Sequence, residues 1–216
     1  MSIALTIALC LRDDEAQLPD MARAAVEVGR ILAREHASGE WRDSTDARDE
    51  PEGDEPEGDS LHFEVLALDE SSRDNTLSVL SILHGKILEL VTVANLAPGT
   101  AIMRTARRAR GRVWLLVDGP FEVEHALWAA RQVFCGDRAA LVPGELLAVE
   151  RNLGQATLGW LRGGLAGAQR EVEQMLAAHD QQGAWSPARA WGLRERTRLF
   201  VRGRLGQLGL GHLDRR

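Results

Sequence analysis

The chain has few of the residues that build disulfide scaffolds, zinc sites or membrane spans. Its 216 residues include only two cysteines, Cys10 and Cys135, which form neither a disulfide framework nor a metal-ligand spacing. A reducing cytoplasm fits that usage best. No apolar run reaches the length of a bilayer span, and the N-terminus lacks the charged and long apolar regions of a signal peptide. These absences predict a cytoplasmic protein, and the length favours one domain with an appendage.

Several catalytic and binding signatures are also missing. The sequence has no Gly-x-Ser-x-Gly elbow and no Gly-x-x-x-x-Gly-Lys loop, which argues against serine hydrolases and P-loop enzymes. The six histidines are scattered, and none has the spacing of a metal motif. The net charge of −6 and the lack of a recognised motif argue against nucleic-acid binding. A bias toward Ala, Arg and Gly indicates a GC-rich bacterial genome.

One segment, residues 39–60, is strongly acidic and rich in proline and glycine. It repeats Glu-Pro-Glu-Gly-Asp in tandem at 50–54 and 55–59. Such a segment cannot bury an apolar face, so we predict a disordered insertion. A calcium site is the alternative, but the ordered ligand pattern and terminal Glu of an EF-hand loop are missing.

Around this insertion, apolar runs typical of strands alternate with helical patterns. This alternation predicts an α/β protein with a mostly parallel sheet and helices on both faces. The predicted strands are residues 3–11, 62–68, 87–94, 113–117 and 139–142, and the predicted helices are residues 16–35, 75–83, 99–110 and 123–134.

Acidic residues follow three of the predicted strands. Glu15 comes soon after the first, Asp69 ends the second, and Asp118 ends the strand at 113–117. Ligands collect at the carboxyl edge of open α/β sheets, so we expect these three side chains to converge there. The plainer alternative is that Asp69 or Asp74 only caps the following helix.

Three segments in this order resemble the inverting family 2 glycosyltransferases, on the nucleotide-diphospho-sugar transferase (GT-A) fold, and in pattern the polyprenyl-phosphate sugar transferases. Residues 10–15 take the place of the family's Pro-Ala-Arg/Tyr-Asn-Glu-Glu. Residues 69–76 take that of Asp-Asp-Gly-Ser-x-Asp-Gly-Thr. Residues 95–111 resemble its Asn-x-Gly-x-Gly-x-Ala segment and the helix that ends Ala-x-Gly. The resemblance spans roughly the first two-thirds of the chain.

The resemblance implies a nucleotide-diphospho-sugar substrate and a role for each acid. Glu15 would approach the ribose or base, and Asp69 would accept a hydrogen bond from uracil or ribose. Asp118 would bind the ribose or a divalent cation, Mn²⁺ or Mg²⁺, that stabilises the leaving nucleoside diphosphate. An acceptor would then attack the anomeric carbon with inversion. No catalytic base is identified.

The chain departs from the family at the metal motif. The family's Asp-x-Asp reads Asp118-Gly119-Pro120 here, and proline cannot ligate a cation, so metal binding should be weakened. Glu122 is a less favoured substitute. Pro98 replaces the family's Lys before Gly99, and no Glu-Asp pair follows Asp118.

Two hypotheses therefore stay open: a glycosyltransferase, or a catalytically degenerate GT-A protein that binds a nucleotide or a partner. A nucleotidyltransferase is weaker, because its Gly-rich N-terminal loop is missing.

The predicted domains are residues 1–150, which would bind the nucleotide-sugar, and residues 151–216, a helical and basic C-terminal segment. Helix is expected over 155–178, interrupted at residues 163–164. Residues 188–216 carry eight arginines among apolar residues; packing on the domain is favoured, and peripheral membrane contact is the alternative. The arginines at 104, 107, 108 and 110 could face a diphosphate, but a solvated basic face is favoured for most of them.

Overall fold

A single mixed sheet forms the centre of the protein. The computed structural model describes residues 3–38, 61–181 and 183–186; the predicted insertion at 39–60 and the basic residues 188–216 lie outside these ranges. Seven strands are present in the described part of the chain, in the order β3-β2-β1-β4-β6-β5-β7. They are β1 (Ile3–Leu11), β2 (His62–Asp69), β3 (Leu90–Val93), β4 (Val113–Val117), β5 (Ala139–Val142), β6 (Leu146–Glu150) and β7 (Ala184–Trp185).

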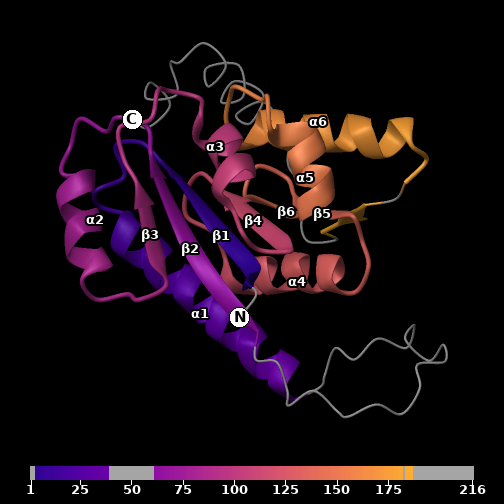
Figure 1. The fold of residues 1–216 in the computed structure, drawn as a ribbon, viewed down its shortest axis with the longest axis horizontal. Coiled ribbons are helices and arrows are strands. Elements are labelled where there is room, and N and C mark those ends of the chain that lie inside the picture. Colours follow the sequence, from indigo (N-terminus) through magenta and orange to yellow (C-terminus); the bar gives the residue numbers. More distant parts are fainter. Residues whose placement is uncertain (1–2, 39–60, 182, 187–216) are drawn as a thin grey trace.

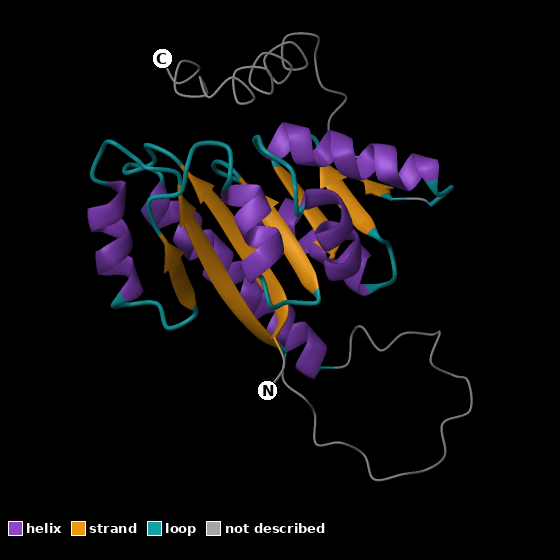
Figure 2. Cartoon of the chain, turned by 45° about the horizontal axis from the view of Figure 1, so that its top comes forward, coloured by secondary structure: helices purple, strands orange, loops and turns teal. Residues whose placement is uncertain are grey.

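Helices cover both faces of the sheet (Figure 2). One set packs on one face and the other set on the opposite face (Figure 1). The first set is α1 (Leu18–Ala37), α2 (Thr76–His84) and α4 (Val123–Phe134); the second is α3 (Ala101–Arg108), α5 (Arg151–Leu158) and α6 (Leu165–Ala178). The predicted α/β class with a mostly parallel sheet is confirmed.

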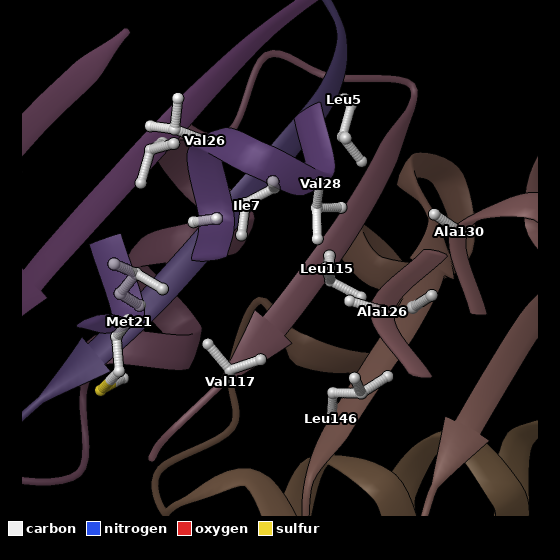
Figure 3. Close-up of a cluster of buried hydrophobic side chains, with 14 of the residues drawn as sticks. Leu5, Ile7, Met21, Val26, Val28, Leu115, Val117, Ala126, Ala130 and Leu146 are labelled. Carbon is white, nitrogen blue, oxygen red and sulfur yellow. The ribbon is translucent and has the colours of Figure 1, made fainter. Parts of the chain in front are cut away.

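The strands supply both cores because successive side chains of a strand point to opposite faces. Leu5 and Ile7 of β1 and Leu115 and Val117 of β4 pack under α1 and α4 (Figure 3). The alternate residues of the same strands, such as Trp114, pack under α3 and α5. A strand that is buried on both faces has a continuous run of apolar residues in its sequence, and for this reason these strands could be predicted.

The prediction missed β6 and the antiparallel pairing that it brings. β6 pairs antiparallel with both β4 and β5. A tight turn joins β5 to β6: the N–H of Glu145 donates to the carbonyl of Val142 (3.0 Å), and Gly144 has φ +71°. A hairpin joins these two strands without an intervening helix, so the alternation of strand and helix does not hold here.

The helices after β6 follow the expected pattern with shifted ends. The predicted interruption at residues 163–164 is present, since α5 ends at Leu158 and α6 begins at Leu165. Both helices contribute buried apolar side chains, including Leu153 of α5 and Val172 of α6, to the core beneath α3. None of the helices within the described ranges is both long enough and apolar enough to traverse a lipid bilayer.

Candidate functional site

The ends of β1, β2 and β4 meet at one edge of the sheet. β1 runs parallel to both neighbours, with Leu11 opposite Asp69 and Leu9 opposite Val117. Asp69 therefore ends β2 and Asp118 follows β4 at the same edge, which we call the carboxyl edge. The loop that carries Glu15 leaves β1 at this edge as well. The structure places the three acids as expected from the sequence, while their roles stay predictions.

The loops after β1 and β2 are locked together by hydrogen bonds. Three consecutive backbone N–H groups of the first loop donate to side chains of the second. The bonds run from Asp13 to Ser72 Oγ (3.0 Å), from Asp14 to Thr76 Oγ1 (2.9 Å) and from Glu15 to Asp74 Oδ2 (3.0 Å). This network fixes the position of residues 12–15 relative to β2, and no pattern in the sequence indicated it.

Glu15 takes part in the same network through its side chain. Its two carboxylate oxygens accept from the backbone N–H (3.2 Å) and the side-chain amide (3.1 Å) of Asn75. Each carboxylate oxygen can accept more than one hydrogen bond. Glu15 is partly exposed, so its carboxylate can still bind a further donor.

Asp69 is fully buried at 0% exposure. Its Oδ1 accepts from the N–H of Ser72 (3.2 Å), and its Oδ2 accepts from the N–H of Asn95 (3.4 Å). The carboxylate thus joins the loop after β2 to the loop after β3. A ligand reaches Asp69 only if one of these loops moves.

Asp74, rather than Asp69, organises the start of α2. Its Oδ1 accepts from the N–H (3.0 Å) and the hydroxyl (2.5 Å) of Thr76, the first residue of the helix. Partial burial acts to raise the pKa of Asp74, but hydrogen bonds from the Thr76 side chain and from backbone N–H groups outweigh it and lower the pKa. The helix-capping alternative therefore suits Asp74.

Glu70 serves another helix, which the sequence analysis did not foresee. Its carboxylate accepts from the N–H groups of Gly99 (2.9 Å) and Ala101 (2.8 Å) at the N-terminus of α3. A carboxylate is stabilised there by the unpaired N–H groups and the helix dipole. The only hint in the sequence was the place of Glu70 as the second acid of the Asp-Asp-like motif.

Asp118 contacts the N-terminus of α6 in a similar way. Its Oδ2 accepts from the N–H of Leu165, the first residue of that helix (3.3 Å). The preceding loop also reaches the start of α3, because the N–H of Gly163 donates to the carbonyl of Gly99 (2.8 Å). Residues 159–164 therefore border the carboxyl edge, although the sequence analysis expected an interruption of the helix only at 163–164.

The pKa of the Cys10 thiol is raised by its surroundings at this edge. The half-buried thiol lies near the end of β1. Burial raises its pKa well above the usual value, and the negative charges of Glu70, Asp118 and Asp14 raise it further. Cys10 therefore stays a neutral thiol, and the carboxylates around it make the edge electronegative.

The described residues do not fit a divalent metal. No group of three His, Cys, Asp or Glu side chains in this part of the chain is placed to hold one ion. Asp118 already accepts from α6, Pro120 offers no ligand, and the backbone N–H of Glu122 donates to Glu145 (2.8 Å). Hard cations need several oxygen ligands, so we derive no chemical step through a metal here.

The four arginines of the α3 region have different surroundings. Arg110 pairs with buried Glu64 (2.7 Å), and Arg107 stacks over the ring of Trp160 (5.8 Å). Arg104 and Arg108 are exposed. The solvated face that the sequence favoured fits these last two.

Comparison with known proteins shows the fold. No protein-family model matches the chain, and no curated protein matches it. Glucosyl-3-phosphoglycerate synthase from Mycobacterium tuberculosis, in complex with UDP, aligns over 97% of this chain and 80% of its own, with a TM-score of 0.54 and 14% identity. S. aureus TarS 1–349 in complex with UDP aligns over 97% of this chain and 68% of its own, with a TM-score of 0.52 and 14% identity.

A second alignment, to another structure of S. aureus TarS 1–349, is much shorter. It covers 54% of this chain and 27% of that protein, at a TM-score of 0.34 and 18% identity, so the chain spans little more than a quarter of that neighbour in this alignment. The longer alignments show that the chain has a GT-A-like fold.

Proposed function

We propose that this chain binds a nucleotide-diphospho-sugar at the carboxyl edge, as a family 2-like glycosyltransferase or a close derivative of one. The observation that carries the proposal is the convergence of Asp69, Asp118 and the Glu15 loop at the edge where ligands bind in open α/β sheets. The two structural neighbours described above, each solved with UDP, support a uridine nucleotide as the first ligand to test.

Each acid has a proposed part. Glu15 accepts from the ribose or the base through its remaining acceptor capacity. Asp69 accepts from uracil or ribose once the covering loop moves, and Asp118 accepts from the ribose. Within this proposal residues 1–150 supply the nucleotide contacts, residues 151–216 add the helical segment that begins with α5, and the protein acts in the cytoplasm.

Calorimetric titration with UDP and UDP-sugars, with and without Mn²⁺, tests the proposal. We expect UDP binding that weakens roughly tenfold or more in Asp69→Asn and in Asp118→Asn, because each loses a charged acceptor. Asp20→Asn is the matched control, since this carboxylate is exposed on α1 and forms an ion pair with Arg23. Equal affinities for the native protein and both site variants would show that the nucleotide binds elsewhere.

A catalytically degenerate binding protein is the second candidate. The contact between Asp118 and the N-terminus of α6 (3.3 Å) favours it, because the one remaining carboxylate of the Asp-x-Asp position is already engaged beside Pro120. We expect Mn²⁺ to add little to UDP affinity in the native chain. Pro120→Asp should increase the effect of Mn²⁺ by supplying a second carboxylate.

Pro120→Asn is the control for this variant, since it frees the backbone in the same way without adding a charge. Tight Mn²⁺-dependent binding by the native chain that survives Asp118→Ala would place the metal site elsewhere. Release of UDP from a UDP-sugar by the native protein, lost in Asp69→Asn, would favour the active enzyme.

A further inference from the structure

A cationic surface with one exposed tryptophan lies beside the carboxyl edge, on the face covered by α3 and α5. Trp160 follows α5 and is 83% exposed. The guanidinium of Arg107 on α3 lies 5.8 Å from the centroid of its ring. Arg104, Arg108 and Arg162 are also exposed on α3 and the loop after α5. We call these five residues the Trp160 surface.

The elements that carry this surface are uniformly basic. α3, α5 and the connecting residues 159–164 contain no Asp or Glu, although the whole chain has a net charge of −6. Glu70, the carboxylate bound at the start of α3, is held by backbone N–H groups. The Trp160 surface is thus a positive area on an acidic protein.

The elements are held in a fixed arrangement. The loop of Trp160 is tied to the start of α3 by the hydrogen bond from Gly163 to Gly99 (2.8 Å). Buried Ile102 of α3 and Leu153 and Leu158 of α5 belong to the same core, and both helices lie on one face of the sheet (Figure 1). The arginines and the tryptophan are therefore presented together.

We propose that the Trp160 surface docks on an anionic phospholipid membrane. Tryptophan favours the headgroup region, where its ring is desolvated while the indole N–H stays hydrated. Arginines around it pair with lipid phosphates. One exposed tryptophan among arginines suits a membrane surface better than it suits single-stranded RNA. The bases of single-stranded RNA typically stack on several aromatic side chains along a groove.

This contact would be peripheral and does not depend on nucleotide binding. It also differs from contact through residues 188–216, because it uses α3 and the loop after α5. Attraction to the membrane should fall as salt screens the charges. Removing three arginines should weaken binding on the order of 100-fold, since each contributes about fivefold near an anionic surface.

Vesicle co-sedimentation with the full chain tests the proposal. The vesicles are phosphatidylcholine alone or phosphatidylcholine mixed with phosphatidylglycerol. The variants are Trp160→Ala and the triple variant R104Q/R107Q/R108Q. The matched controls are Trp185→Ala, which removes a tryptophan that is 51% exposed on β7, and R198Q/R202Q/R204Q, which removes the same charge from the C-terminal residues.

The proposal expects salt-sensitive binding to the mixed vesicles only. Trp160→Ala should weaken it severalfold, the α3 triple variant should nearly abolish it, and both controls should bind like the native protein. No binding to either vesicle would overturn the proposal. Loss only in the C-terminal triple variant would also overturn it, as would tighter binding to a single-stranded RNA oligonucleotide that depends on the same arginines.

Discussion

The carboxylates at the two edges of the sheet have different partners, an arginine at one edge and backbone N–H groups at the other. At the amino edge, Glu64 is 4% exposed, pairs with the guanidinium of Arg110 (2.7 Å) and accepts from the hydroxyl of Thr6 (2.8 Å). At the carboxyl edge, Asp69 and Glu70 accept from backbone N–H groups. Neither forms an ion pair with another described residue.

This difference separates a stabilising edge from a binding edge. A buried charge next to an opposite charge is compensated in place, so removing either partner of the Glu64 and Arg110 pair would leave an uncompensated charge and destabilise the fold. Backbone dipoles hold a carboxylate without cancelling its charge. Burial raises the pKa of Cys10, and the negative charge that remains at the carboxyl edge raises it further; this charge is available to a ligand.

The strongest test of the amino edge is Gly111→Ala. Gly111 precedes β4, and a Cβ there would lie 2.5 Å from the backbone nitrogen of Thr6 and 2.7 Å from the carbonyl carbon of Leu5. The backbone of a central strand cannot yield, so we expect a loss of about 3 kcal/mol or more in unfolding free energy. Urea denaturation measures it.

Gly119→Ala is the matched control at the other end of β4. A Cβ at Gly119 would meet nothing within 4 Å, so the expected change is within about 1 kcal/mol. A Gly111→Ala protein as stable as the Gly119→Ala protein would show that β1 and β4 can separate locally, and the amino edge would then not be the rigid one.

A smaller effect is expected from Glu64→Gln. Glutamine keeps one oxygen for the hydroxyl of Thr6 and the N–H of Arg110, but replaces the oxygen that accepts from the guanidinium (2.8 Å). We expect a loss of about 1–2 kcal/mol, because the group is buried but Arg110 remains largely solvated. UDP affinity should be unchanged.

Asp20→Asn again provides the comparison, since its exposed pair with Arg23 should contribute less than about 1 kcal/mol. If Glu64→Gln were as stable as the native protein while Asp69→Asn lost several kcal/mol, the assignment of stability to one edge and binding to the other would be reversed.

The smallest effect concerns the pH dependence of stability at the two edges. The pKa of Asp74 at the carboxyl edge is lowered below 3.8 by the hydrogen bonds described above, which outweigh its partial burial. Its contribution is therefore present at neutral pH and is lost as the pH falls through the folded-state pKa. The stability difference between the native protein and Asp74→Asn should shrink below about pH 4.

The pKa of Asp137, at the amino edge, is shifted in the opposite direction to that of Asp74. Partial burial raises its pKa above 3.8, so its relative contribution is favourable in acid and is lost as the pH rises through the folded-state pKa. As the pH falls from neutral, the urea midpoint of Asp74→Asn should therefore rise relative to that of the native protein, and the urea midpoint of Asp137→Asn should fall relative to it. Parallel trends would show that neither carboxyl titrates as its surroundings indicate.

Much of the framework could be predicted from the sequence. Residues 3–11, 113–117, 123–134 and 139–142 were expected as strands or a helix and are β1, β4, α4 and β5 with the same ends. The spacing of apolar residues is a local property of the sequence. It predicts a strand or helix correctly when the apolar residues of that element are buried in the fold. The hairpin to β6 was missed because a short apolar strand after a turn carries no periodic signal of its own.

Local sequence patterns are sufficient to predict the α/β alternation, the burial of the strands and the edge at which Asp69 and Asp118 lie. The contacts of the acids at this edge depend on tertiary packing: Glu70 binds the start of α3, 31 residues away, and Asp118 binds the start of α6, 47 residues away. A helix N-terminus attracts a carboxylate through the unpaired N–H groups of its own first turn and through the helix dipole. Which carboxylate reaches which helix depends on how the layers pack, and no local pattern encodes that distance.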